Sequence, residues 1–114
     1  MYVDVMMAAV EQGRKDEYLA HVREAAEIFK AHGALGLMET WEREVPDGEL
    51  TSMPMAVKRE PGEAVVVSVV RWPSREAAER GMAGVMSDPR MERMEMPFDG
   101  KRLIYGGFDV IMDA

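Results

Sequence analysis

The chain contains no cysteine. This absence excludes disulfides, thiolate metal ligands, a thiol nucleophile and iron–sulfur chemistry. There is also no apolar run that approaches the roughly 20 residues needed to span a bilayer. The N-terminal stretch contains Asp4 and lacks the basic residues that begin a secretory leader. We therefore expect a cytoplasmic protein with no membrane partner.

Clustered positive charge is absent as well. The 14 Lys and Arg residues are outnumbered by 21 Asp and Glu residues, which gives a formal net charge of -7, and the two signs are mixed along the chain. Nucleic acids are bound by clustered Lys and Arg, so nucleic acid is not expected as a partner. A chain of 114 residues with 47% hydrophobic residues can build one core, and we predict a single domain over 1–114.

Histidine is scarce. His21 and His32 are the only two, and they lie eleven positions apart on one predicted helix, which separates them by about 16 Å along its axis. They cannot bind one metal ion together, and no predicted strand carries a histidine that could ligate haem. The sequence also lacks an HExxH motif, a phosphate-binding glycine loop and a nucleotide fingerprint. It therefore predicts no metal site and no cofactor.

What the sequence does contain is a clear alternation of strand and helix patterns. Gly33 is placed to end the first helix and Ser74 to cap the second. The expected elements are strands at 1–10, 34–43, 64–72 and 101–112, and helices at 14–32 and from Ser74 to the break at 87–90. This β-α-β-β-α-β order predicts an α+β, ferredoxin-like fold, a four-stranded antiparallel sheet with two helices on one face.

The opposite face of such a sheet is bare. By alternation, we expect Val3, Val5 and Met7 to face the helices together with Ile104, Gly106, Phe108 and Val110. Tyr2, Asp4, Met6, Leu103, Tyr105, Gly107 and Asp109 are then expected to face away. Large apolar and aromatic groups on a bare face are costly in water. The sequence thus predicts a homodimer formed through the open sheet face.

Several motifs together resemble those of a known family. They are Tyr-Val-Asp from Tyr2, Val-Pro-Asp-Gly from Val45, Met-Ala-Val-Lys from Met55, Ser-Asp-Pro-Arg-Met from Ser87 and the long stretch MPFDGKRLIYGGF from Met96 to Phe108. The chain resembles, over essentially its whole length, the YbaA-like family of uncharacterised proteins in the dimeric α/β-barrel superfamily. The resemblance implies subunits that pair sheet to sheet around a cavity. It implies no reaction, although the wider superfamily includes cofactor-independent monooxygenases, haem-degrading enzymes, isomerases and chlorite dismutases.

Polar residues inside strand patterns are the candidate site residues. Glu39 lies mid-strand and is the first candidate for a catalytic base, because burial would raise the pKa of its carboxyl group. Tyr105 is the second catalytic candidate, as a group that orients a ligand. The candidate ligand-binding residues are Trp41, Asp4, Ser68 and Asp109. Solvent exposure at a strand edge is the alternative for the polar residues, and a subunit interface is the alternative for both aromatic residues.

We interpret two glycines and the methionines as structural residues rather than as parts of a binding site. Gly106 and Gly107 predict a close approach within the last strand, by a helix or a partner chain rather than by a ligand. The 12 methionines include a Met-Glu-Arg-Met-Glu-Met run at 91–96, which could resemble a soft-metal site. We interpret them instead as adaptable core filler.

Two functional hypotheses follow. The first is a homodimer that encloses a small apolar or aromatic molecule between its sheets, as a cofactor-independent monooxygenase, an isomerase or a binding protein. The alternative is a non-catalytic interaction or stress-associated module without a ligand cavity. An enclosed cavity of about 300 Å³ or more with convergent polar groups would support the first hypothesis, and a dry, filled interface the second.

Overall fold

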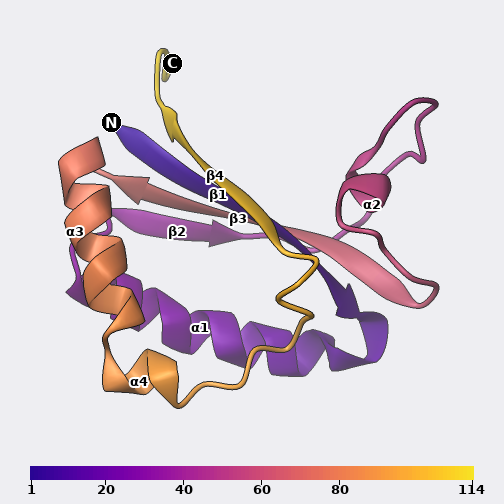
Figure 1. Cartoon of the computed structure of the whole chain (residues 1–114), viewed down its shortest axis with the longest axis horizontal. Helices are drawn as coiled ribbons and strands as arrows, with labels where there is room; N and C mark the ends of the chain where they lie inside the picture. Colours follow the sequence, from indigo (N-terminus) through magenta and orange to yellow (C-terminus); the bar gives the residue numbers. More distant parts are fainter.

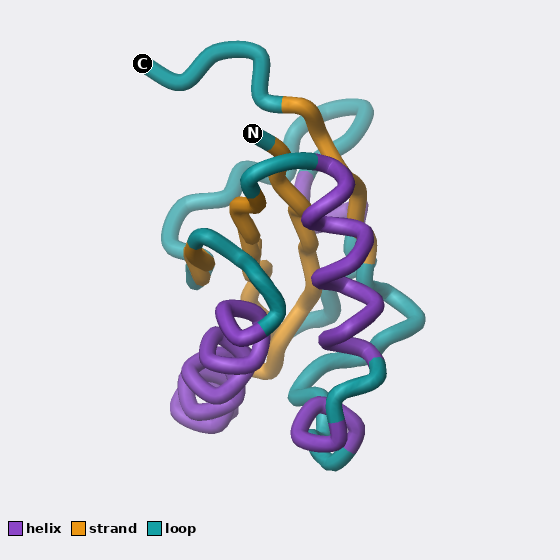
Figure 2. Tube along the Cα trace, turned by 90° about the vertical axis from the view of Figure 1, so that its left-hand side faces the viewer, coloured by secondary structure: helices purple, strands orange, loops and turns teal.

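A computed structural model describes residues 1–114 (Figure 1). Its centre is a sheet of four strands: β1 (Tyr2–Glu11), β2 (Gly36–Glu39), β3 (Glu63–Trp72) and β4 (Ile104–Asp109). The strand order is β2-β3-β1-β4, and every neighbouring pair is antiparallel. The two long helices, α1 (Lys15–Ala31) and α3 (Arg75–Met86), pack on the same face of this sheet (Figures 1 and 2). The predicted ferredoxin-like architecture is confirmed.

The ends of the long helices follow local sequence signals. A short 3-10 turn, η1 (Gln12–Arg14), leads from β1 into α1. Gly33 follows α1 with a φ of 102°, a left-handed conformation that glycine adopts without strain. Ser74 caps α3, because its Oγ accepts a hydrogen bond from the Ala77 amide over 3.1 Å. Both predicted helix boundaries are confirmed.

Two one-turn helices were not predicted. α2 (Met53–Ala56) lies within the long connection between β2 and β3, and α4 (Pro89–Glu92) follows α3. Each begins with a capped turn and an early proline: Ser52 Oγ accepts from the Met55 amide over 3.1 Å, and Asp88 Oδ1 accepts from the Arg90 amide over 2.9 Å. Proline at the first helical positions favours such turns.

The last strand is shorter than the predicted 101–112, since β4 begins only at Ile104 and ends at Asp109. The late start is explained by a side-chain network around Asp99. Its Oδ1 accepts from the Lys101 amide over 2.9 Å, and its Oδ2 accepts from Arg102 Nε over 3.1 Å. Arg102 also pairs with Glu63 over 2.7 Å. These contacts hold the two basic residues in a turn, so they cannot extend the strand.

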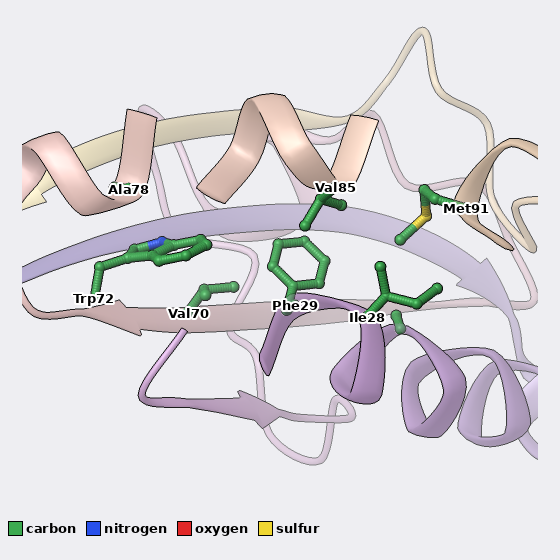
Figure 3. Packing of buried hydrophobic residues seen from close by; sticks show 8 residues of the cluster. Ile28, Phe29, Val70, Trp72, Ala78, Val85 and Met91 are labelled. Carbon is green, nitrogen blue, oxygen red and sulfur yellow. The ribbon is translucent and has the colours of Figure 1, made fainter. Parts of the chain in front are cut away.

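The strand faces are the reverse of those predicted. Tyr2 pairs with Trp72 and with Asp109, and Met6 pairs with Ser68 and with Tyr105. Directly paired residues share a face, and Trp72 packs against α1 and α3 in the main core cluster (Figure 3). The even-numbered residues of β1 therefore face the helices. Alternation separated the two faces correctly, but it could not show which one the helices cover because both are apolar.

The surface on the other side of the sheet is called here the open face. It consists of Val3, Val5, Met7, Met38, Val67, Val69, Arg71, Ile104, Gly106 and Phe108. Met38 and Phe108 are the most exposed of these, at 60% and 55%. One end of this surface is covered, because Val57, which follows α2, packs against Ala9 and Val65. The remainder is not covered by any part of the chain.

The two glycines of β4 have different neighbours. Gly107 lies beneath the ring of Tyr2 on the adjacent strand, where an added Cβ would come within 1.7 Å of Tyr2 Oη. Gly106 lies on the open face, where an added Cβ would be 3.3 Å from the ring of Phe108. The expected close approach exists at Gly107, but a neighbouring side chain makes it, rather than a helix or a partner chain.

Candidate functional site

An apolar cavity of about 280 Å³ lies between the sheet and the helices. We call it the helix-side cavity. Its walls come from β1, β3, α1, α3 and the segment from Met91 to Leu103, and 15 of its 19 lining residues are hydrophobic. Such a cavity, mostly apolar with a few polar groups, is typical of small-molecule sites. It lies within one chain, on the helix side of the sheet, and so differs from the ligand space predicted between the sheets of two subunits, which stays a prediction.

Three polar residues meet at the sheet side of the cavity: Tyr18, Glu39 and Ser68, called here the Glu39 cluster. The Tyr18 hydroxyl donates to Glu39 Oε2 over 3.0 Å, and Ser68 Oγ donates to the same oxygen over 2.5 Å. Glu39 Oε1 makes no hydrogen bond. It is therefore not fully buried, because every fully buried side-chain polar atom in the protein has a partner. Glu39 is among the residues that line the cavity, so Oε1 is the carboxyl oxygen left available to a molecule held there.

The backbone explains why these groups meet. Glu39 is the last residue of β2 and lies directly opposite Ser68 on β3, so both side chains point towards the helices. Tyr18 is buried in the first half of α1, which crosses this part of the sheet. Trp41 packs on the Tyr18 ring, with 5.9 Å between ring centroids, and limits its movement.

Burial sets the ionisation of the cluster. It raises the pKa of Glu39, while the hydroxyls of Ser68 and Tyr18 partly oppose this by stabilising the charged form. Burial also raises the pKa of Tyr18, so its phenol remains a donor. A carboxylate with a raised pKa and one oxygen without a hydrogen bond, beside an apolar cavity, is suited to act as a proton acceptor.

His21 borders the same cavity from α1, one helical turn after Tyr18. Its ring meets Phe98 edge-on, with 6.4 Å between centroids. Burial lowers the pKa of His21, which favours the neutral imidazole. From the sequence, His21 was considered only as a metal ligand, and Tyr18 was not among the candidate site residues. The available signal was their spacing of three, which places both on one helix face.

Six methionines are among the lining residues: Met6 and Met7 of β1, and Met82, Met86, Met91 and Met96 of the opposite wall. Met91 is buried and belongs to the main core cluster, which agrees with the predicted filling role (Figure 3). Met86 is 66% exposed and lies at the cavity's outer edge. The methionines therefore fill the core and also form a flexible boundary to the cavity.

The structure brings together Glu39 and Ser68 but places the other predicted site residues elsewhere. Asp4 accepts a hydrogen bond from Trp72 Nε1 over 2.9 Å and serves the core. Tyr105 is 81% exposed and Asp109 is also exposed, since β4 is an edge strand beyond the helical cover.

Trp41 was expected on the open face together with Tyr105, but both lie on the helix side of the sheet. Trp41 packs on Tyr18, and Lys15 Nζ lies 5.5 Å from the centre of its ring. Its role is thus to support Tyr18 rather than to stack on a ligand at the open face.

Outside the helix-side cavity, the structure presents few groups that could bind a ligand or a metal ion. No group of three or more His, Asp or Glu side chains is arranged to hold a metal ion. None of the helices has the length and apolarity required to span a membrane. A second hollow, of about 350 Å³, has no hydrophobic lining residue. Its one cation, Arg59, already pairs with Glu42, to which Nη1 donates over 2.5 Å.

Comparisons with known proteins agree with this fold. The "Uncharacterized protein YbaA" of Escherichia coli strain K12 and that of Shigella flexneri are each 47% identical to the chain over 114 residues, covering 98% of this chain and 97% of the relative. A crystal structure of a mutant of MhuD, with two manganese protoporphyrin IX molecules bound per active site, superposes with a TM-score of 0.62. It is 17% identical and covers 100% of this chain and 98% of that one, a likeness of fold. Residues 1–100 match the family described as "Protein of unknown function (DUF1428)", and the chain belongs to this family.

Proposed function

We propose that this protein is an enzyme that moves a proton on a small apolar or aromatic molecule held in the helix-side cavity, with Glu39 as the general base. The observation that carries the proposal is the carboxyl group itself. One of its oxygens is held by two hydroxyl donors, and the other makes no hydrogen bond on a residue that lines an apolar cavity. Of the two reaction classes considered, isomerisation is the one that this geometry supports, because it requires only a positioned base and a weakly acidic C–H bond.

The fold comparison supports a ligand-binding role. The MhuD structure, which shares this fold, contains two manganese protoporphyrin IX molecules per active site. A cavity of about 280 Å³ in this chain fits a smaller body, such as one or two fused rings. A module without a ligand cavity, the alternative hypothesis, is less consistent with an apolar cavity that contains a hydrogen-bonded carboxyl group.

We also propose that two copies pair through the open face. Its residues are apolar apart from Arg71, and large side chains such as Met38 and Phe108 remain more than half exposed in the single chain. Burying such a surface is favourable by about 25 cal/mol per Å². A second copy is the occupant that we favour, because a two-fold dimer covers this surface with the same, largely apolar surface of the other copy. The helix-side cavity stays accessible in that arrangement, since it lies on the opposite side of the sheet.

Deuterium exchange tests the catalytic proposal without knowledge of the natural substrate. The probe is 2-tetralone, an apolar bicyclic ketone with acidic C–H bonds, in deuterated buffer near neutral pH. Proton NMR follows the loss of these hydrogens with the wild type, with Glu39→Gln and without protein. We expect the wild type to accelerate exchange over Glu39→Gln by about 10²-fold or more. Equal rates for the two proteins would overturn the assignment of Glu39 as a base.

A further inference from the structure

We infer that the helix-side cavity selects an uncharged ligand that carries one hydrogen-bond donor, a phenol or enol hydroxyl, on an apolar body. This inference rests on the proposed function, because it describes the molecule that the same cavity holds. It goes further by assigning the polar group of that molecule. The assignment follows from the free hydrogen-bonding capacity left in the cavity.

The orientation of the Glu39 carboxyl group is fixed. Tyr18 and Ser68 both donate to Oε2, and they approach from different elements, α1 and β3. Rotation of the group would break one or both of these hydrogen bonds. Oε1 is therefore the oxygen presented to the ligand, and an ionised carboxylate oxygen can only accept.

A ligand hydroxyl can donate to Oε1 and form a charge-assisted hydrogen bond. A carbonyl or ether oxygen in the same position would place an acceptor against an acceptor. Each oxygen would then lose the hydrogen bond that it makes in water, which carries a penalty in a buried site. A ketone such as 2-tetralone is therefore expected to bind with its acidic C–H bond, and not its carbonyl oxygen, at Oε1. The carboxyl group thus distinguishes a hydroxyl from its methyl ether, although the two differ little in shape.

The charge of the lining restricts the ligand further. No Lys or Arg side chain borders the cavity, and its titratable residues are Glu39, Tyr18 and His21. Burial lowers the pKa of His21, so no fixed positive charge is available to neutralise an anion. A ligand carboxylate or phosphate would lie near the Glu39 carboxylate without a counter-charge. The cavity therefore favours a neutral molecule.

The opposite wall permits variation in the apolar body. It is formed largely by methionines of α3 and the following segment, including Met82, Met86 and Met96. Unbranched thioether side chains change rotamer at low cost and adapt to different shapes. Selectivity is consequently concentrated at Glu39, while the methionine wall accepts ring systems of different outline.

A panel of four probes with the same ring system tests the inference: 2-naphthol, naphthalene, 2-methoxynaphthalene and 2-naphthoate. Probe fluorescence or calorimetry gives their affinities for the full-length protein. We expect 2-naphthol to bind at least tenfold more tightly than 2-methoxynaphthalene, and 2-naphthoate to bind most weakly. Naphthalene should bind at an intermediate level through the apolar walls alone.

The Glu39→Gln variant should reverse the order of the two neutral oxygen compounds. Its amide oxygen must take the position of Oε2 to accept from Tyr18 and Ser68, so its NH₂ group replaces Oε1 and becomes a donor. 2-Methoxynaphthalene should then bind more tightly than 2-naphthol. Glu44→Gln, at an exposed position outside the cavity, is the matched control and should retain the wild-type order.

The outcomes separate the two proposals. Equal affinity of the wild type for 2-naphthol and 2-methoxynaphthalene would overturn the inference but leave the cavity as a ligand site. Absence of binding by all four probes would contradict both the inference and the proposed function. If Glu39→Gln does not fold, the four wild-type affinities still decide between these results.

Discussion

The indole Nε1 of Trp72 donates a hydrogen bond of 2.9 Å to Asp4 Oδ2 across neighbouring strands of the sheet. Trp72 is fully buried, so its N–H group has no access to water if the acceptor is removed. We expect Asp4→Ala to lower the free energy of unfolding by about 1–3 kcal/mol, the usual penalty for an unsatisfied buried donor. Urea denaturation followed by tryptophan fluorescence measures this loss.

Asp4→Asn is the matched control, because its amide oxygen can still accept from the indole. It should retain most of the wild-type stability. If the alanine and asparagine variants were equally stable, the hydrogen bond would not be the reason for an aspartate at this inward position.

Gly81 on α3 allows the helix to approach the sheet closely. An added Cβ would lie 2.1 Å from Trp72 Cζ3 and 2.8 Å from the carbonyl oxygen of His32. The backbone oxygen cannot move aside easily, so Gly81→Ala should destabilise the protein by about 1–3 kcal/mol through overpacking. Gly13→Ala is the control, since no atom lies within 4 Å of its added Cβ. Denaturant midpoints should shift for the first variant and change little for the second.

The proposed dimer predicts a clear effect of charge on the open face. Val69 lies on β3 next to Met38 and its side chain points away from the helices. Val69→Glu would place a carboxylate in an apolar interface, where it has no partner, so we expect a monomer at micromolar concentration. Leu50→Glu, at a position that is 98% exposed, should leave the assembly unchanged. Sedimentation velocity measures both, and a monomeric wild type would refute the dimer itself.

The order of the main elements could be predicted because their signals are local. Gly33 and Ser74 marked helix ends, and the apolar periods marked strands and helices. Which face of the sheet the helices cover could not be predicted in this way. Val3 and Val5 suit a core as well as they suit an open surface, and the placement of Asp4 depends on Trp72, which is distant in sequence.

The site was predictable only in part for the same reason. Glu39 was singled out as a carboxylate within an apolar strand, a pattern visible in the sequence alone. Its partners depend on the register between β2 and β3 and on the position of α1, which brings in Tyr18. The last strand was also too long in the prediction, because the pairing of Arg102 with Glu63 joins segments that are far apart along the chain.

The pKa of Glu39 provides a further test. Burial raises it, and the Ser68 hydroxyl partly opposes this by stabilising the carboxylate. We expect Ser68→Ala to raise the pKa further, because the charged form loses a donor. Titration of the Glu39 side-chain carboxyl by carbon-13 NMR measures the shift directly.

The same shift has a defined effect on stability. A carboxyl whose folded pKa exceeds its unfolded value binds its proton more tightly when folded, so the free energy of unfolding falls as pH rises from the unfolded pKa to the folded one. Ser68→Ala should extend this fall to higher pH. Ser74→Ala is the control: it removes the cap of α3 and should cost about 1 kcal/mol at every pH, without altering the titration of Glu39. A Glu39 pKa that is unchanged or lowered in Ser68→Ala would show that the hydroxyl does not stabilise the charged carboxylate, and the orientation assigned to Oε1 would lose its support.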